Sequence, residues 1–145
     1  MTDSNDVKTI VGTALQRADA FISLNQVGEA IKVLQEAIKD YTPQSDCLEV
    51  TPILDVLGRL HVEAGEMKDA QHYYCRSLLA KQKEFGIVSR ELAVAYRNVA
   101  SCATDEASRN SALAQAQTME LPEAEFQFLK QSLLSDDELD VLKIL

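Results

Sequence analysis

Apolar residues recur at intervals of three and four along most of this chain, which places them on one face of a helix. The segment 52–79 shows this most clearly, because Gly65 separates two apolar stripes. The stripes consist of Leu54, Leu57, Gly58 and Val62, and then of Met67, Ala70, Tyr74 and Leu78. Glycine adopts the left-handed conformation that ends many helices at little cost. The segment is therefore predicted to form two short helices folded back on each other.

Gly58 stands in the interior of the first of these helices. Glycine there costs about 1 kcal/mol relative to alanine, so a compensating contact is expected. Close approach of the second helix through Gly58 and Ala70, with Tyr74 beside them, would supply it. The alternative is a glycine present by chance in an ordinary helical hairpin.

Similar patterns flank this segment on both sides. Residues 7–22 carry a helical stripe, 25–28 interrupt it, and a second stripe over 30–41 ends before Pro43. A polar connector follows over 42–51. After the central segment, its second helix is expected to continue to Phe85 and to stop at Gly86.

The C-terminal third is predicted to be helical too. A helix over 92–103 precedes one that Thr104 or Asp105 can cap. Pro122 fits the first turn of a further helix, whose apolar face is formed by Phe126, Leu129, Leu133 and Leu134. The run Ser135-Asp136-Asp137-Glu138 is typical of a capping box that opens a last short helix.

The central segment resembles the tetratricopeptide repeat, a family of short helix-turn-helix units. The residues at that family's spacing are Leu57, Gly58, Gly65, Ala70, Tyr74 and Leu78. His61 replaces the aromatic residue of its first helix, and Ser77 replaces a small residue of its second. The extension to Gly86 is similar to the longer-repeat variety found in kinesin light chains.

In the preceding segment, Asn25 takes the place of the turn glycine. Its matched residues Ala18, Phe21, Ala30 and Leu34 correspond to Gly58, His61, Ala70 and Tyr74. Ala30, Ala70 and Ala112 mark the repeats at nearly equal intervals along the chain. The resemblance implies an all-α fold, an α-solenoid of about three helix-turn-helix repeats in a single domain over 1–145. The repeats would span about 6–43, 51–86 and 88–120, with capping helices over 122–145.

Stacked repeats of this family form a superhelix whose concave wall is lined by their first helices. The resemblance therefore implies a groove that binds a peptide or helix of a partner protein. The partner-binding candidates are Gln16, Asp19, Ile22 and Ser23, then Asp55, Arg59, Val62 and Glu63, then Arg97, Asn98 and Ser101. The register adds Leu15, Val56, Val94 and Asp105 to the same wall. A solvated wall without a ligand is the alternative.

The charges of this wall bear on the partner. Four acids, at positions 19, 55, 63 and 105, favour a basic or amphipathic segment, whereas Arg59 and Arg97 either hold an acidic group or pair within the chain. Family members that bind the acidic tails of heat-shock chaperones use lysines and asparagines here. This chain has Leu15, Asp19, Val56, Val94 and Asn98 at those positions, which argues against that role.

Candidate chemistry is sparse. His61 and His72 lie eleven residues apart, which is not a metal-ligand spacing on one helix, and no HExxH, CxxC or Gly-rich phosphate loop is present. The sequence therefore predicts no catalytic residues, no cofactor and no metal.

Composition limits the partners and the cellular compartment that we expect for this chain. With 14 basic and 23 acidic residues the net charge is −9, which disfavours nucleic acid and anionic membranes as partners. No apolar run is long enough to span a membrane. Cys47, Cys75 and Cys102 share no close spacing, so free thiols in a cytoplasmic protein are expected.

The pattern leaves other functions open. A small acidic secretion-type chaperone, like the type III secretion chaperones of this family, is one alternative, and apolar groove positions such as Ile22, Val62 and Val94 favour it. Self-assembly through the exposed face of the first or last helix, as a homodimer or scaffold, is another. An enzyme whose site the sequence does not reveal is the third.

Overall fold

The structure is a computed structural model that describes residues 4–136. Seven α-helices and two short 3-10 turns make up this part of the chain, and it contains no β-strand. The helices are α1 (Ser4–Ser23), α2 (Val27–Ala37), α3 (Thr51–Glu63), α4 (Met67–Phe85), α5 (Ala93–Ser101), α6 (Glu106–Met119) and α7 (Glu123–Asp136), with η1 (Leu48–Val50) before α3 and η2 (Arg90–Leu92) before α5. The predicted all-α class is confirmed. None of the described helices combines the length and apolar character that crossing a membrane requires.

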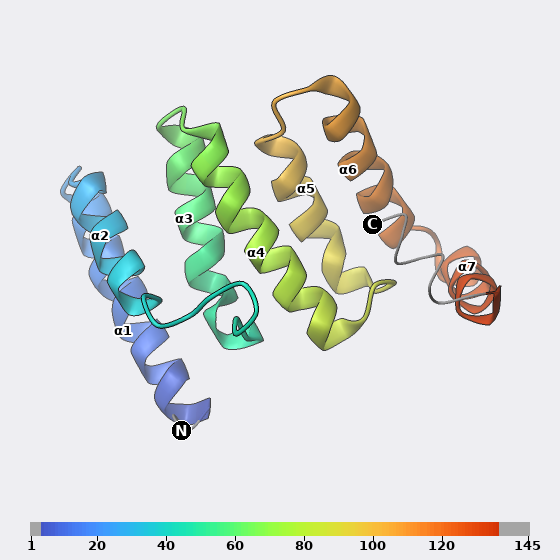
Figure 1. Cartoon of the computed structure of the whole chain (residues 1–145), viewed down its shortest axis with the longest axis horizontal. Coiled ribbons are helices and arrows are strands. Elements are labelled where there is room, and N and C mark those ends of the chain that lie inside the picture. Colours follow the sequence, from blue (N-terminus) through green and yellow to red (C-terminus); the bar gives the residue numbers. More distant parts are fainter. Residues whose placement is uncertain (1–3, 137–145) are drawn as a thin grey trace.

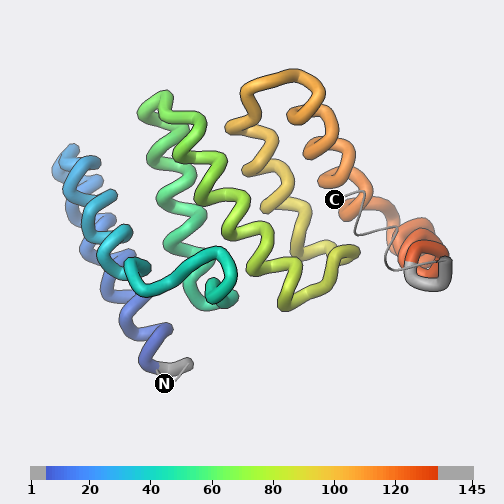
Figure 2. Tube along the Cα trace, in the orientation of Figure 1, coloured from blue at the N-terminus to red at the C-terminus, as the bar shows by residue number. Residues whose placement is uncertain are grey.

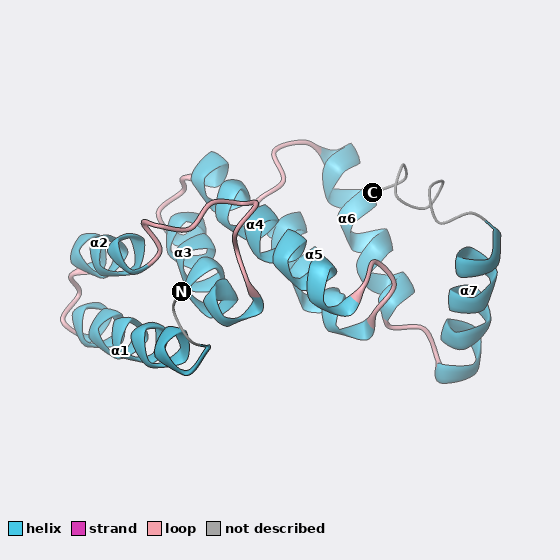
Figure 3. Ribbon diagram, turned by 60° about the horizontal axis from the view of Figure 1, so that its bottom comes forward, coloured by secondary structure: helices cyan, strands magenta, loops and turns pink. Residues whose placement is uncertain are grey.

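The helices pack as three antiparallel hairpins. α1 packs on α2, α3 on α4, and α5 on α6, while α3 also contacts α1 and α2, and α4 contacts α5. The hairpins follow one another in a row from the N-terminal to the C-terminal side (Figures 1 and 2). Figure 3 shows α7 at the far end of this row, beyond α6.

The first two hairpins have the same turn. The Gln26 amide donates to the Phe21 carbonyl, and the Glu66 amide donates to the His61 carbonyl, both at 2.8 Å. Asn25 and Gly65 have φ of 58° and 77°. Asparagine tolerates this left-handed conformation better than most residues do, which confirms that Asn25 replaces the turn glycine. The break is shorter than predicted, since α2 already begins at residue 27.

The third hairpin turns differently. Asp105 caps α6, with its carboxylate accepting from the Ser108 amide at 2.7 Å and from the Ser108 hydroxyl at 2.9 Å. These hydrogen bonds lower the pKa of Asp105. The turn spans 102–105, one residue more than 64–66. It contains no positive-φ residue.

The buried core consists of three clusters, each of which joins neighbouring hairpins or helices. Its largest cluster joins α1, α2 and α3 and includes the fully buried Leu34, Ile53, Leu54, Leu57 and Leu60. Ala70, Tyr74 and Cys102 form a second cluster between the second and third hairpins. A third cluster joins α5, α6 and α7. Small and large residues face each other within the hairpins, as Gly58 does with Tyr74.

The connector between the first two hairpins is bound to α4. The buried Asp46 carboxylate accepts two hydrogen bonds of 2.8 Å from Arg76, whose side chain is 10% exposed. Arg76 also donates to the Tyr41 carbonyl at 3.4 Å. Lys83 donates to the carbonyls of Pro43 and Gln44. The long connector is therefore held against the second hairpin rather than left free.

Arg90 of η2 connects α7 to the third hairpin. Its guanidinium donates to the Leu121 carbonyl at 2.7 Å, pairs with Glu123 at 3.0 Å and lies 4.5 Å from the centre of the Phe126 ring. Phe126 is buried as predicted, whereas Leu129 and Leu133 are only half-buried. α7 continues through residues 135 and 136, so the prediction that Ser135 opens a new helix is wrong. The rest of that predicted helix lies outside the described residues.

Candidate partner-binding surface

The predicted groove residues lie on α1, α3 and α5, the first helices of the three hairpins, except for Asp105, which caps α6. Each of them is exposed or half-buried, and none belongs to the buried core. The exposed ones are Gln16, Asp19, Ser23, Arg59, Glu63, Arg97 and Ser101, and the half-buried ones are Ile22, Asp55, Val62 and Asn98. The helical periodicity thus separates surface from core correctly on these three helices.

The charged groove residues are largely paired within the chain. Arg59 lies 3.9 Å from Glu63 one turn later, and Arg97 pairs with Glu120, which follows α6. Of the two options for the arginines, the structure shows internal pairing. Asp55 accepts from Lys81 of α4 at 3.0 Å.

Two acids among the predicted groove residues remain, Asp105 and Asp19. The Asp105 carboxylate accepts a hydrogen bond from the Ser108 amide as the cap of α6. Within the described residues, Asp19 is the one groove acid whose carboxylate has no ion pair or hydrogen bond. Most charges of the predicted groove residues therefore already have a partner within the chain.

Apolar side chains accompany these charges. Val94 of α5 is 61% exposed, and the half-buried members are Leu15, Ile22, Val56 and Val62. An exposed valine on the surface of a helix has no structural role of its own. With most charges compensated, these side chains offer the strongest gain on binding, because burying apolar area contributes about 25 cal/mol per Å².

Sequence reasoning missed one residue that reaches this surface from α4. Lys81 extends to Asp55, although it belongs to a second helix. Tyr74, by contrast, was predicted beside Gly58, and its ring lies buried against that glycine. Burial raises the pKa of the Tyr74 hydroxyl, and the negative charge of Asp55 raises it further.

A histidine and two acids meet at the turn between α3 and α4. His61, Glu66 and Asp69 place one potential ligand atom each within 4.8 Å of the others. The His61 ring stacks on Tyr73 at 5.5 Å, and its Nδ1 lies 3.2 Å from the Glu66 carboxylate. Its Nε2 is buried and has no partner among the described residues.

This arrangement fits a turn held by a His61–Glu66 hydrogen bond better than it fits a metal site. A metal on Nδ1 requires the proton on Nε2, and metal-binding histidines usually donate that proton to an acceptor. Here Nε2 has none among the described residues, whereas a proton on Nδ1 can be donated to Glu66. The absence of a metal stays a prediction.

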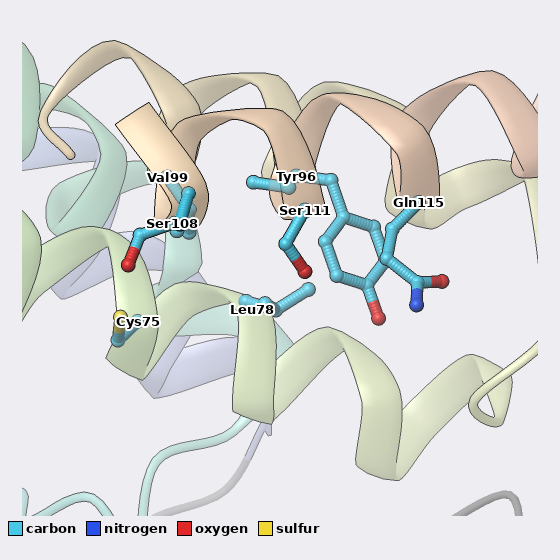
Figure 4. Close-up of a pocket in the computed structure, with 9 residues that line it drawn as sticks. Cys75, Leu78, Tyr96, Val99, Ser108, Ser111 and Gln115 are labelled. Atoms are coloured by element: carbon cyan, nitrogen blue, oxygen red, sulfur yellow. The ribbon is translucent and has the colours of Figure 1, made fainter. Parts of the chain in front are cut away.

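A hollow of about 460 Å³ lies between α4, α5 and α6. Figure 4 shows Tyr96, Ser111 and Gln115 on one side of it, with Cys75 and Leu78 on the other. Burial raises the pKa of the Cys75 thiol and of the Tyr96 hydroxyl. Its titratable lining therefore contains neither an activated nucleophile nor a base beside one.

Comparison with known proteins adds no relative. No protein-family model, curated protein or solved structure matches the chain.

Proposed function

We propose that this chain is a non-catalytic protein-interaction module, a tetratricopeptide-like solenoid of the longer-repeat variety. Its groove, lined by α1, α3 and α5, binds a peptide or helix of a partner protein. The matching turns at Asn25 and Gly65 support the repeat, since they join equivalent pairs of helices in the first two hairpins. The free thiols at positions 47, 75 and 102 favour a reducing, cytoplasmic setting.

One observation carries the proposal most. Along the three first helices, apolar side chains stay accessible beside charges that are already compensated, with Val94 the most exposed. An amphipathic helix suits such a surface, because its apolar face fills the wall while its polar face stays in water. A strongly basic peptide suits it less, since Asp55 and Glu63 already have cationic partners.

Asp19 predicts one further feature of the partner. Asp19 sits one turn from Ile22 on α1 and has no cation of its own among the described residues. A partner helix with one lysine or arginine next to its apolar face would complete this charge. The ion pair would add selectivity more than affinity, as rim charges usually do.

A displayed library of peptides of about 15 residues, roughly four helical turns, tests the proposal. Peptides selected on the wild-type chain should be amphipathic and should bind a Val94→Asp variant about tenfold more weakly or worse, because a charge then meets their apolar face. Leu113→Asp on α6 is the matched control, since Leu113 is also exposed but lies off the groove. Selected peptides that bind Val94→Asp as tightly as the wild type would refute the groove.

A further inference from the structure

The outer face of the first hairpin, which lies at one end of the row, is not covered by any described element (Figure 1). It is formed by Ile10, Ala14 and Arg17 of α1 and by Val33, Glu36 and Ala37 of α2. At the other end of the row α7 covers the third hairpin through Phe126. Repeat arrays require their end faces to be covered or polar. No described element covers this face, and it is only partly polar, because Ile10 is 50% exposed on it.

The face has a self-complementary shape. Ile10 and Ala37 line two hollows. One, of about 270 Å³, lies between α1 and α2, and the other, of about 320 Å³, is also lined by the connector and η1 through Tyr41, Ser45 and Val50. Ile10 therefore stands as a ridge between two depressions. In a two-fold symmetric contact, a residue that enters the partner's surface receives the equivalent residue in return. The ridge of one copy can then fill a hollow of the other, and the reverse.

The charges of the face are self-complementary as well. Arg17 and Glu36 line the same hollow but do not pair with each other. Within the described residues the Arg17 guanidinium has no partner, and Glu36 pairs only with the exposed Lys39. Two chains of net charge −9 repel each other over most of their surface. Asp40 lines the second hollow and adds an acid to the face, whereas Arg17 offsets part of the repulsion and allows two Arg17–Glu36 pairs across a two-fold axis.

We propose that a second copy of this chain docks on the outer face, with Ile10 of each copy in a hollow of the other and Arg17 of each beside Glu36 of the other. The contact leaves the groove on α1, α3 and α5 accessible, because Leu15 and Ile22 lie on a different side of α1 from Ile10 and Arg17. The dimer proposal therefore does not depend on the proposed function. Each dimer would carry two accessible grooves, one on each copy.

Sedimentation equilibrium of the full chain over a concentration series tests this directly. The mass should rise from 16.0 kDa toward twice that value with concentration. Ile10→Asp should weaken the dimer by about tenfold or more, since it removes the central apolar contact. Leu79→Asp, at a residue 47% exposed on α4, is the matched control and should leave association unchanged. Circular dichroism verifies that each variant is folded.

Charge exchange separates this face from any other interface. Arg17→Glu alone and Glu36→Arg alone should each weaken the dimer, and the two together should restore it, because the pairs reform with opposite sign. A wild-type mass that stays at 16.0 kDa throughout the series overturns the proposal. So does a dimer that survives Ile10→Asp, or a double variant that is weaker than both single ones. Binding of selected peptides by a wild-type chain that stays monomeric leaves the groove proposal standing when the dimer proposal fails.

Discussion

The Tyr74 ring occupies the space that a side chain at Gly58 would need. A Cβ built at position 58 would lie 2.6 Å from Cδ1 and Cε1 of Tyr74, well inside the closest contact that carbon atoms make. Gly58 is therefore required by packing and not by backbone conformation. The predicted contact between Gly58 and Tyr74 is confirmed, and the Tyr74 side chain, not the α4 backbone, lies closest above Gly58.

Gly58→Ala should destabilise the chain although alanine is the better helix former. The added methyl group must displace the Tyr74 ring from the core, and overpacking of this kind costs about 1–3 kcal/mol. That exceeds the gain of about 1 kcal/mol from helix propensity. Urea unfolding followed by circular dichroism measures the difference.

Gly12→Ala is the matched control for that substitution. Gly12 lies in α1, and a Cβ added there would meet nothing within 4 Å from the parts of the chain packed around it, so the substitution should gain about 0.5–1 kcal/mol. We therefore expect Gly58→Ala to lower the free energy of unfolding and Gly12→Ala to raise it. Equal stabilisation by both would mean that Tyr74 moves aside freely.

Arg76→Met should cost about 3–5 kcal/mol of unfolding free energy, because it leaves the buried Asp46 carboxylate without its cation. Arg59→Met removes an arginine whose ion pair is exposed, and should change stability by less than about 1 kcal/mol. Guanidinium chloride titration of both variants provides the comparison. Similar small effects at both positions would show that the connector does not depend on Arg76.

His61→Phe should leave the chain as stable as the wild type or stabilise it by up to about 1 kcal/mol. The phenyl ring keeps the stack on Tyr73 and removes the buried Nε2 that has no partner among the described residues. Glu66 loses one hydrogen bond, but its side chain is 50% exposed and can be hydrated instead. Thermal unfolding of this variant shows whether its stability rises or falls relative to the wild type. A clear loss of stability would assign the His61–Glu66 contact a larger role.

Asp105 should make stability depend on pH in the acid range. Its pKa in the folded chain lies below the ordinary value of 3.8, so its contribution is present above that value and is lost as the pH falls through the folded pKa. Asp105→Asn keeps an acceptor for the Ser108 amide but does not titrate. The difference in unfolding free energy between wild type and variant should therefore shrink on acidification. A difference that stays constant with pH would contradict the cap.

Cys102 should resist thiol reagents in the folded chain. Burial raises its pKa to about 11, with the nearby Cys75 adding to the effect, so at pH 8 about one thiol in a thousand is ionised. A colorimetric thiol assay should count three reactive cysteines in denaturant and find Cys102 unlabelled without it. Rapid native labelling at Cys102, located by mass spectrometry, would show that α5 and α6 open.

The local features of this fold were predictable because they depend on neighbours in the chain. The stripes located α1 to α6, and Gly58, Asn25 and Asp105 each signalled a packing, turn or cap role through residue type and position. Helix ends were less accurate, as the continuation of α7 past residue 135 shows. A serine before acids favours a cap, but it does not end a helix by itself.

The tertiary ion pairs were not predictable from the sequence. Asp46 and Arg76 are 30 residues apart, and Arg97 and Glu120 are 23 apart, so no local pattern links them. Internal pairs changed the interpretation of the predicted groove. The sequence left open whether Arg59 and Arg97 hold an acidic group or pair within the chain, and both pair within it. Among the described residues, Asp19 is the one predicted groove acid without an ion pair or hydrogen bond.

The Asp46–Arg76 contact also has a consequence for how the chain loses its structure. In stacked helical hairpins, stability is approximately the sum of each hairpin's own stability and of its interfaces with its neighbours. The salt bridge from the junction of the first two hairpins into the middle of α4 adds to one such interface, so we expect these hairpins to melt together as one block from α1 to the end of α4. No equally buried pair joins α6 or α7 to that block among the described residues, so fraying is expected to begin at the C-terminal end.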